Sequence, residues 1–175
     1  MSAVWRRPGF RPRSTVSLVT PAPLILWDLE VAPDWVDYNG HMNDAAYALA
    51  FSRAGDRWMQ HIALGPAERE ATGYTLYTLQ IMLHYFHEVK LGAALRVTAQ
   101  LLEHDSKRAR LWMELRSPLD GPVVAATEQL YLSVRQARAV PWREESLARL
   151  TEMAEAHASL AIPPQAGKGI SLKRA

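Results

Sequence analysis

Hydrophobic and polar positions alternate through much of this chain, which is the period of β-strands that bury one face. The alternation is clearest over residues 107–116, where alanine, leucine or methionine occupies every second position. Residues 74–89 are aromatic and partly β-branched, with apolar residues on both faces. The pattern predicts five strands, at residues 25–31, 74–89, 94–104, 107–116 and 123–135.

Residues 44–62 have a different period, because their apolar residues recur three and four positions apart. They predict one helix of about five turns. Asn43 is a suitable N-cap, and Gly65-Pro66 is a suitable stop. A short helical turn at residues 67–71 and a second helix at residues 142–159 are also expected. The apolar stripe of the long helix consists of Tyr47, Ala50, Phe51, Ala54, Trp58 and Ile62.

The order of these elements predicts an α+β fold, in which an antiparallel sheet wraps around the long helix. A βαβ arrangement would need a helix between successive strands. We expect a basic tail at residues 1–22, the main domain at residues 23–140, and a C-terminal helix and tail at residues 141–175. A half-wrapped sheet leaves an exposed edge, which predicts pairing of two protomers; a homodimer and a homotetramer both fit.

The composition argues against several classes of function for this protein. The 175 residues include no cysteine, which excludes disulfides, thiolate metal sites and cysteine nucleophiles. The histidines have no spacing typical of a metal site, so no metal or other cofactor is expected. The net charge of +2 owes much to arginines in the N-terminal tail, so no nucleic-acid partner is expected. No apolar run reaches the ~18 residues of a membrane span, and a cytoplasmic location is the default.

One segment between the first strand and the long helix combines a carboxylate, a glycine, a histidine and an amide. A helix start collects free backbone N–H groups and the positive end of the helix dipole. Such a place polarises a carbonyl group, and a neighbouring carboxylate can attack that carbonyl or activate water. The segment therefore indicates an acyl-transfer or hydrolysis site. Its residues are Asp37-Tyr38-Asn39-Gly40-His41-Met42-Asn43-Asp44.

This segment and the order of elements resemble the hotdog-fold acyl-CoA thioesterases. The 4-hydroxybenzoyl-CoA thioesterase-like group has a motif of aspartate, two residues, Gly-His, an apolar residue and asparagine, and every position is filled here. The resemblance covers roughly residues 24–137. It implies the hotdog fold and hydrolysis of an acyl-CoA thioester.

The resemblance implies that Asp37 is the nucleophile or the general base, although an aspartate in a turn often bonds its own backbone. The N–H of Gly40 or of His41 is a candidate oxyanion donor, and Gly40 is equally a plain turn glycine. His41 orients Asp37, holds the thioester or binds water, or it is a structural histidine that ties the turn together. Asn43 is first a helix cap and second a site residue.

A narrower resemblance is to the thioesterases of carnitine breakdown that act on betainyl-CoA, alone or joined to L-carnitine dehydrogenase. Residues 36–47, 87–92, 156–160 and 164–170 carry it, whereas the arginine-rich N-terminus does not. A betainyl group is a quaternary ammonium, a cation that aromatic faces bind. Our hypothesis is that two or more of four aromatic residues line the acyl pocket, although each is also a core candidate: Trp35, Tyr38, Trp58 and Tyr85.

Other charged residues have open roles. Glu128 lies on an apolar strand face, where it either pairs with an arginine or meets a cationic substrate. The phosphates of CoA need basic contacts. Unranked candidates for these contacts are Lys90, Arg108, Arg110, Arg116 and Arg135.

Two other functions fit the same fold. In the enoyl-thioester hydratases and dehydratases of this fold, four residues separate the aspartate from the histidine. In this chain, three residues separate Asp37 from His41, which disfavours that function. A non-catalytic module that binds acyl-CoA would not need the carboxylate of Asp37.

Overall fold

The structure is a computed structural model, and it describes residues 20–171. Its elements in chain order are β1 (Leu24–Glu30), the 3₁₀ turn η1 (Pro33–Trp35), α1 (Asp44–His61), α2 (Pro66–Thr72), β2 (Tyr74–Tyr85), β3 (Ala94–His104), β4 (Arg108–Arg116), β5 (Val123–Arg135), β6 (Arg138–Ala139) and α3 (Glu144–His157).

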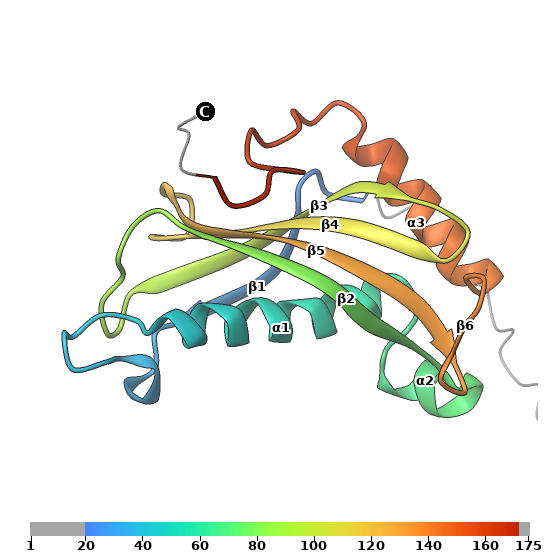
Figure 1. The fold of residues 1–175 in the computed structure, drawn as a ribbon, viewed down its shortest axis with the longest axis horizontal. Coiled ribbons are helices and arrows are strands. Elements are labelled where there is room, and N and C mark those ends of the chain that lie inside the picture. Colours follow the sequence, from blue (N-terminus) through green and yellow to red (C-terminus); the bar gives the residue numbers. More distant parts are fainter. Residues whose placement is uncertain (1–19, 172–175) are drawn as a thin grey trace, which may run out of the picture.

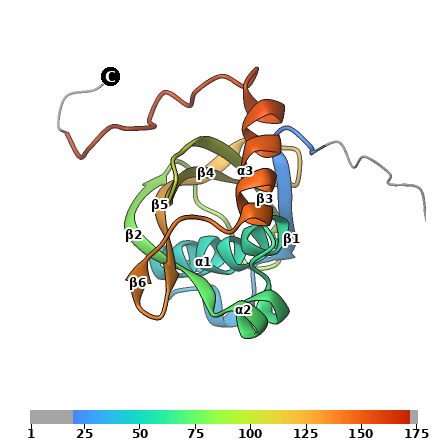
Figure 2. The same cartoon turned by 90° about the vertical axis from the view of Figure 1, so that its right-hand side faces the viewer.

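The strands form one antiparallel sheet in the order β1-β3-β4-β5-β2, and the short β6 pairs with the end of β5. The sheet curls around α1, which lies along its concave inner face (Figures 1 and 2). The predicted α+β architecture, an antiparallel sheet wrapped around a long helix, is confirmed.

The apolar stripe of α1 explains its close contact with the sheet. Tyr47 and Phe51 are buried, and Ala50 and Ala54 have no exposed surface. Their small side chains allow the helix backbone to approach the strands. The alternating residues of β3, β4 and β5 supply the other side of this core.

The convex outer face of the sheet is covered in part by α3 and by the chain that follows it (Figure 1). His157, the last residue of α3, fixes this layer. Its Nδ1 accepts the N–H of Leu101 at 2.9 Å, and its Nε2 lies 3.1 Å from the carbonyl oxygen of Pro21. The contact falls where the pairing of β3 with β4 is irregular.

One strand is shorter than expected. The strand predicted at residues 74–89 ends at Tyr85, because the N–H groups of Phe86 and His87 both turn to the carbonyl of Val124. The predicted N-terminal tail lies almost entirely outside the described residues. Within residues 20–171, no helix is both long and apolar enough to cross a membrane.

Candidate active site

A tight turn presents the predicted carboxylate. The N–H of Asp37 donates to the carbonyl of His41 at 2.9 Å, and the N–H of Gly40 donates to the carbonyl of Asp37 at 3.0 Å. Gly40 has a φ of +78°, which a residue with a side chain rarely adopts. The N–H of Asn39 donates to Oδ1 of Asp37 at 2.8 Å. The turn therefore holds the carboxylate of Asp37 in one place.

The turn leads directly into the start of α1. Oδ1 of Asn43 accepts the N–H of Ala45 at 2.9 Å, and the carbonyl of Asn43 accepts the N–H of Ala46. Asn43 is thus the N-cap that the sequence predicts. The N–H of Asp44, the first helical residue, has no acceptor within the described part of the chain. It is the free donor at the positive end of the helix.

The segment after β2 holds this helix start from the other side. The N–H of Met42 donates to the carbonyl of Val89 at 2.8 Å, and His41 and Lys90 form an antiparallel bridge. Nε2 of His41 lies 3.4 Å from a carboxylate oxygen of Glu88. The imidazole of His41 therefore has an acidic neighbour, and the backbone of His41 is paired with the segment after β2.

Two tyrosines close the same corner. The hydroxyl of Tyr85 donates to the carbonyl of Asp44 at 3.3 Å, and its ring meets that of Tyr47 edge to face at 5.4 Å. The hydroxyl of Tyr47 donates to the carbonyl of His87 at 3.4 Å. Burial raises the pKa of both phenols, so they remain neutral donors at ordinary pH. Of the four predicted aromatic residues, Tyr85 therefore lies at the helix start.

A cleft of about 330 Å³ lies between η1 and the first turns of α1. Asp37 and Asn43 line it together with Trp35, Asp34 and Leu49. Trp35 is mostly buried, and the guanidinium carbon of Arg53 lies 5.7 Å from the centre of its ring. The cleft joins the predicted carboxylate to one of the predicted aromatic residues.

The other two aromatic candidates do not line this cleft. Trp58 has no exposed surface and stacks on Tyr131 at 5.1 Å in the core. It is also 14 residues along α1 from Asp44, which is about 21 Å. Tyr38 is 97% exposed at the tip of the turn. The structure thus brings Trp35 and Tyr85 to the helix start and does not bring Trp58 there.

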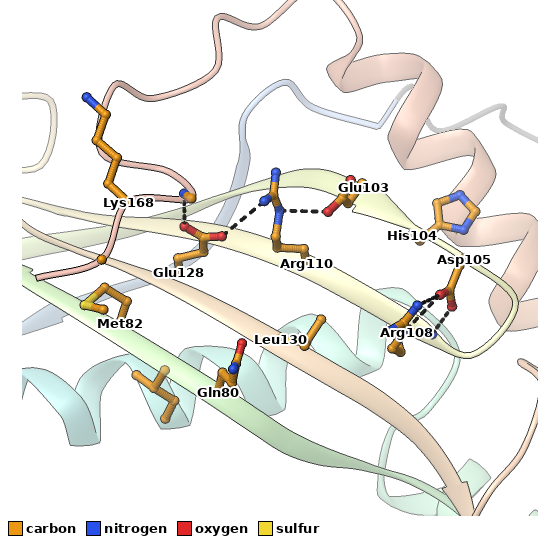
Figure 3. A pocket seen from close by; sticks show the side chains of 13 residues that line it. Gln80, Met82, Glu103, His104, Asp105, Arg108, Arg110, Glu128, Leu130 and Lys168 are labelled. Carbon is orange, nitrogen blue, oxygen red and sulfur yellow. Dashed lines mark hydrogen bonds and ion pairs between the residues drawn. The ribbon is translucent and has the colours of Figure 1, made fainter.

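Glu128 lies on the outer face of the sheet, in a separate hollow of about 740 Å³ (Figure 3). One of its carboxylate oxygens accepts the N–H of Gly167 at 2.6 Å, and the other lies 3.5 Å from Nη1 of Arg110. Arg110 also pairs with Glu103, and Arg108 pairs with Asp105. Most of the charges in this hollow therefore neutralise one another, and none of the residues of the turn lines it.

Sequence reasoning missed three parts of this corner: the N–H of Asp44, the carboxylate of Glu88 and the hydroxyl of Tyr47. A free backbone donor follows from the position of a cap, so Asn43 was a signal for Asp44. Glu88 and Tyr47 meet the turn only through the fold. Among residues 20–171, no three histidine, aspartate or glutamate side chains are grouped as a metal site would need.

Comparison with known proteins identifies the family. The model of the thioesterase-like superfamily matches residues 31–150. The betainyl-CoA thioesterase of Pseudomonas aeruginosa is 44% identical over 151 residues, which are 85% of this chain and 95% of that protein. The L-carnitine dehydrogenase/betainyl-CoA thioesterase of Rhizobium meliloti is 36% identical over 173 residues, 98% of this chain but 34% of that longer protein.

Solved structures agree with this result. A protein of Staphylococcus aureus in complex with CoA has a TM-score of 0.81 at 26% identity, covering 87% of this chain and 98% of that one. A putative thioesterase of Pseudomonas putida has a TM-score of 0.76 at 34% identity, covering 88% and 99%. The chain belongs to the thioesterase-like superfamily. The predictions of a hotdog fold and of a thioesterase are confirmed.

Proposed function

We propose that this protein hydrolyses betainyl-CoA to betaine and CoA, with Asp37 as the nucleophile or the general base. The observation that carries the proposal is the position of this carboxylate, which is fixed by the turn that leads into α1, seven residues before the free N–H of Asp44. The similarity to the betainyl-CoA thioesterase of Pseudomonas aeruginosa supports the choice of acyl group.

The helix start has the parts that thioester hydrolysis needs. As Asp37 or an activated water attacks the carbonyl carbon, negative charge develops on the carbonyl oxygen. The N–H of Gly40 already donates within the turn, so we assign the oxyanion contact to the N–H of Asp44 instead. The dipole of α1 stabilises the same charge. If water attacks, Asp37 takes up its proton, the C–S bond breaks, and that proton passes to the thiolate of CoA, which leaves as the thiol together with betaine. If Asp37 attacks, the C–S bond breaks to leave a mixed anhydride on Asp37; water then hydrolyses the anhydride, which releases betaine, restores the carboxylate and supplies the proton of the CoA thiol.

The acyl end carries a permanent positive charge, and carboxylates surround the helix start. Asp34 and Asp37 line the cleft, and Glu88 lies beside His41. Opposite charges attract, and aromatic faces bind quaternary ammonium groups. We propose Tyr85 as the aromatic contact of the quaternary ammonium, since it lies at the start of α1, whereas the ring of Trp35 already has the guanidinium carbon of Arg53 5.7 Å from its centre. The role of His41 in this proposal is to orient the thioester beside Asp37.

We further propose that the protein is a homo-oligomer built through the free edge of β2. This strand ends the sheet and exposes large apolar side chains along its length. Exposed apolar edges pair with further strands. Tyr85, the last residue of β2, contacts the start of α1, so a second copy on this edge would lie beside the proposed site.

The test is thiol release from a panel of CoA esters: betainyl, acetyl, a medium-chain acyl and an aromatic acyl. The chain has no cysteine, so a thiol reagent reports free CoA alone. We expect betainyl-CoA to have the highest kcat/KM. A preference for another ester would contradict betainyl-CoA as the substrate, but the protein would still be a thioesterase. No release from any ester, together with tight binding, would indicate a binding module.

A further inference from the structure

Most arginines of the sheet already pair with carboxylates; Arg135 forms no such pair within residues 20–171, but it lies at the opposite end of β2 from Tyr85, with its guanidinium carbon 5.6 Å from the ring centre of Tyr74. Arg108 pairs with Asp105, Arg110 with Glu103 and Glu128, and Arg116 with Glu114. A phosphate would have to compete with these carboxylates for the same guanidinium N–H groups, and it would be repelled by their negative charge. Three of the five basic residues nominated from the sequence are therefore poor candidates for the phosphates of CoA.

Two arginines on α1 have a different environment. The guanidinium carbon of Arg57 lies 4.0 Å above the ring centre of Trp27, and that of Arg53 lies 5.7 Å above the ring centre of Trp35. Within residues 20–171, neither guanidinium pairs with a carboxylate, and the neighbouring Asp56 forms no ion pair with them. The two like charges four residues apart repel each other, and the contacts with Trp27 and Trp35 offset this repulsion.

Stacking prepares a guanidinium for binding an anion. The aromatic ring occupies the flat face of the group and limits its rotation, while the N–H edge remains available. One N–H of Arg57 donates to the carbonyl of Arg53 at 3.2 Å, which further fixes its direction. A planar fork that is held in place binds a phosphate through two parallel hydrogen bonds.

The position of these arginines relative to Asp37 fits an extended ligand. Trp35 is a wall of the cleft that contains Asp37, and its ring is also the platform for Arg53. Arg53 and Arg57 are nine and 13 residues along α1 from Asp44, which correspond to about 14 and 20 Å. An extended ligand with its reacting group at the carboxylate of Asp37 would therefore pass Leu49, then Arg53 and then Arg57.

We propose that Arg53 and Arg57 bind the phosphate groups of the CoA moiety, with the pantetheine arm lying along the exposed side of α1 from the cleft. The inference rests on the proposed thioesterase function, because it needs the thioester carbonyl beside Asp37. It assigns the arginines to binding and gives them no part in the bond-breaking step.

The test compares two esters that share an acyl group. Betainyl-CoA carries the phosphates, and the betainyl thioester of pantetheine does not. We expect Arg53→Gln and Arg57→Gln each to raise the KM for betainyl-CoA by on the order of tenfold, since each removes a charge-assisted contact, while kcat changes less than about twofold. The KM for the pantetheine ester should stay at the wild-type value.

The matched control is Arg149→Gln, which removes an exposed arginine from α3. It should leave both KM values unchanged. Arg53→Lys keeps the charge without the planar fork, so its KM for betainyl-CoA should lie between those of the wild type and Arg53→Gln. Thermal unfolding of each variant checks that the fold is intact.

Binding of free CoA, measured by calorimetry, tests the inference independently of turnover. The glutamine variants should weaken this binding by a similar factor and reduce its dependence on salt. Equal effects on both esters, or normal CoA affinity in the double variant, would overturn the assignment of the arginines. Absence of turnover of either ester by the wild type would instead overturn the proposed function.

Discussion

The carboxylate of Asp37 is held by its own turn, so the two interpretations of this residue are compatible. Oδ1 accepts the N–H of Asn39 at 2.8 Å, while Oδ2 has only a long contact of 3.5 Å with the side chain of Asn39. One oxygen therefore fixes the group and the other remains available for chemistry. A residue can form an Asx turn and still attack a carbonyl.

This division of roles predicts the result of Asp37→Asn. The side-chain oxygen of asparagine can still accept the N–H of Asn39, so the free energy of unfolding should change little. The amide can neither attack the carbonyl nor take a proton, so kcat should fall on the order of a thousandfold. Thiol release and chemical denaturation measure the two effects. Full turnover by the folded variant would refute the role of Asp37.

The cap at the start of α1 gives a second prediction. Asn43→Ala removes the oxygen that accepts the N–H of Ala45, but the carboxylate of Asp44 also accepts that N–H at 2.8 Å. We therefore expect a loss of about 0.5–1 kcal/mol in the free energy of unfolding, the lower part of the range for caps. Urea denaturation measures it. Asn43→Asp, which keeps an acceptor, is the control and should be near the wild type.

At the scale of elements, the hydrophobic periodicity predicted the regular helices and strands. The helix expected at residues 44–62 is observed as Asp44–His61, and the strands expected at residues 94–104 and 123–135 have the same bounds in the structure. These segments bury one face, so their pattern carries the information. The same stripe contains Trp58, and a pattern cannot tell a core aromatic residue from one that lines a site.

Elements that depend on unusual backbone or on distant contacts were not predictable. The hairpin between β5 and β6 turns at Gln136 and Ala137, which both have positive φ, whereas glycine and asparagine are the usual residues there. Tyr85 reaches Tyr47 because β2 lies at the edge of the sheet. There β2 pairs with β5, which is distant in sequence, and not with β3, the next strand along the chain. No local signal marks that arrangement.

His157 links α3 to β3 and makes this contact sensitive to pH. Burial lowers the pKa of His157 below its ordinary value of 6.5, and the ring accepts the N–H of Leu101 through Nδ1, which requires the neutral form. Between pH 6.5 and the lower pKa of the folded protein, His157 is protonated in the unfolded chain and neutral in the folded protein. The unfolding free energy should therefore be highest above pH 6.5 and fall as the pH drops below it.

Urea denaturation at pH 7.5 and 5.5 tests this link. His157→Gln should be less stable than the wild type at pH 7.5, and it should lose less stability on acidification. The pKa of His61 is lowered as well, so the dependence should be reduced and not abolished. An identical loss in the variant and the wild type would show that His157 is not the group that titrates.

At the scale of the whole molecule, the two edges of the sheet differ. The edge at β1 carries charged residues, and Asp28 pairs with Arg96 on the neighbouring β3. The edge at β2 exposes about half of each of four large apolar side chains: Tyr77, Leu79, Ile81 and Tyr85. Charged edges resist pairing with another strand, whereas apolar edges favour it. This asymmetry makes β2 the edge at which the proposed homo-oligomer would form.

Ile81→Lys tests this arrangement, because a charge in the middle of β2 opposes pairing of the strand with its copy. Light scattering should show the wild type as an oligomer and the variant as a monomer. Since Tyr85 joins this strand to the start of α1, turnover should fall with the loss of the oligomer. The control is Leu147→Lys, a similar change at an exposed leucine of α3, which should keep both the oligomer and the activity. A monomeric wild type with full turnover would mean that one chain completes the site, and the apolar edge would then need another explanation.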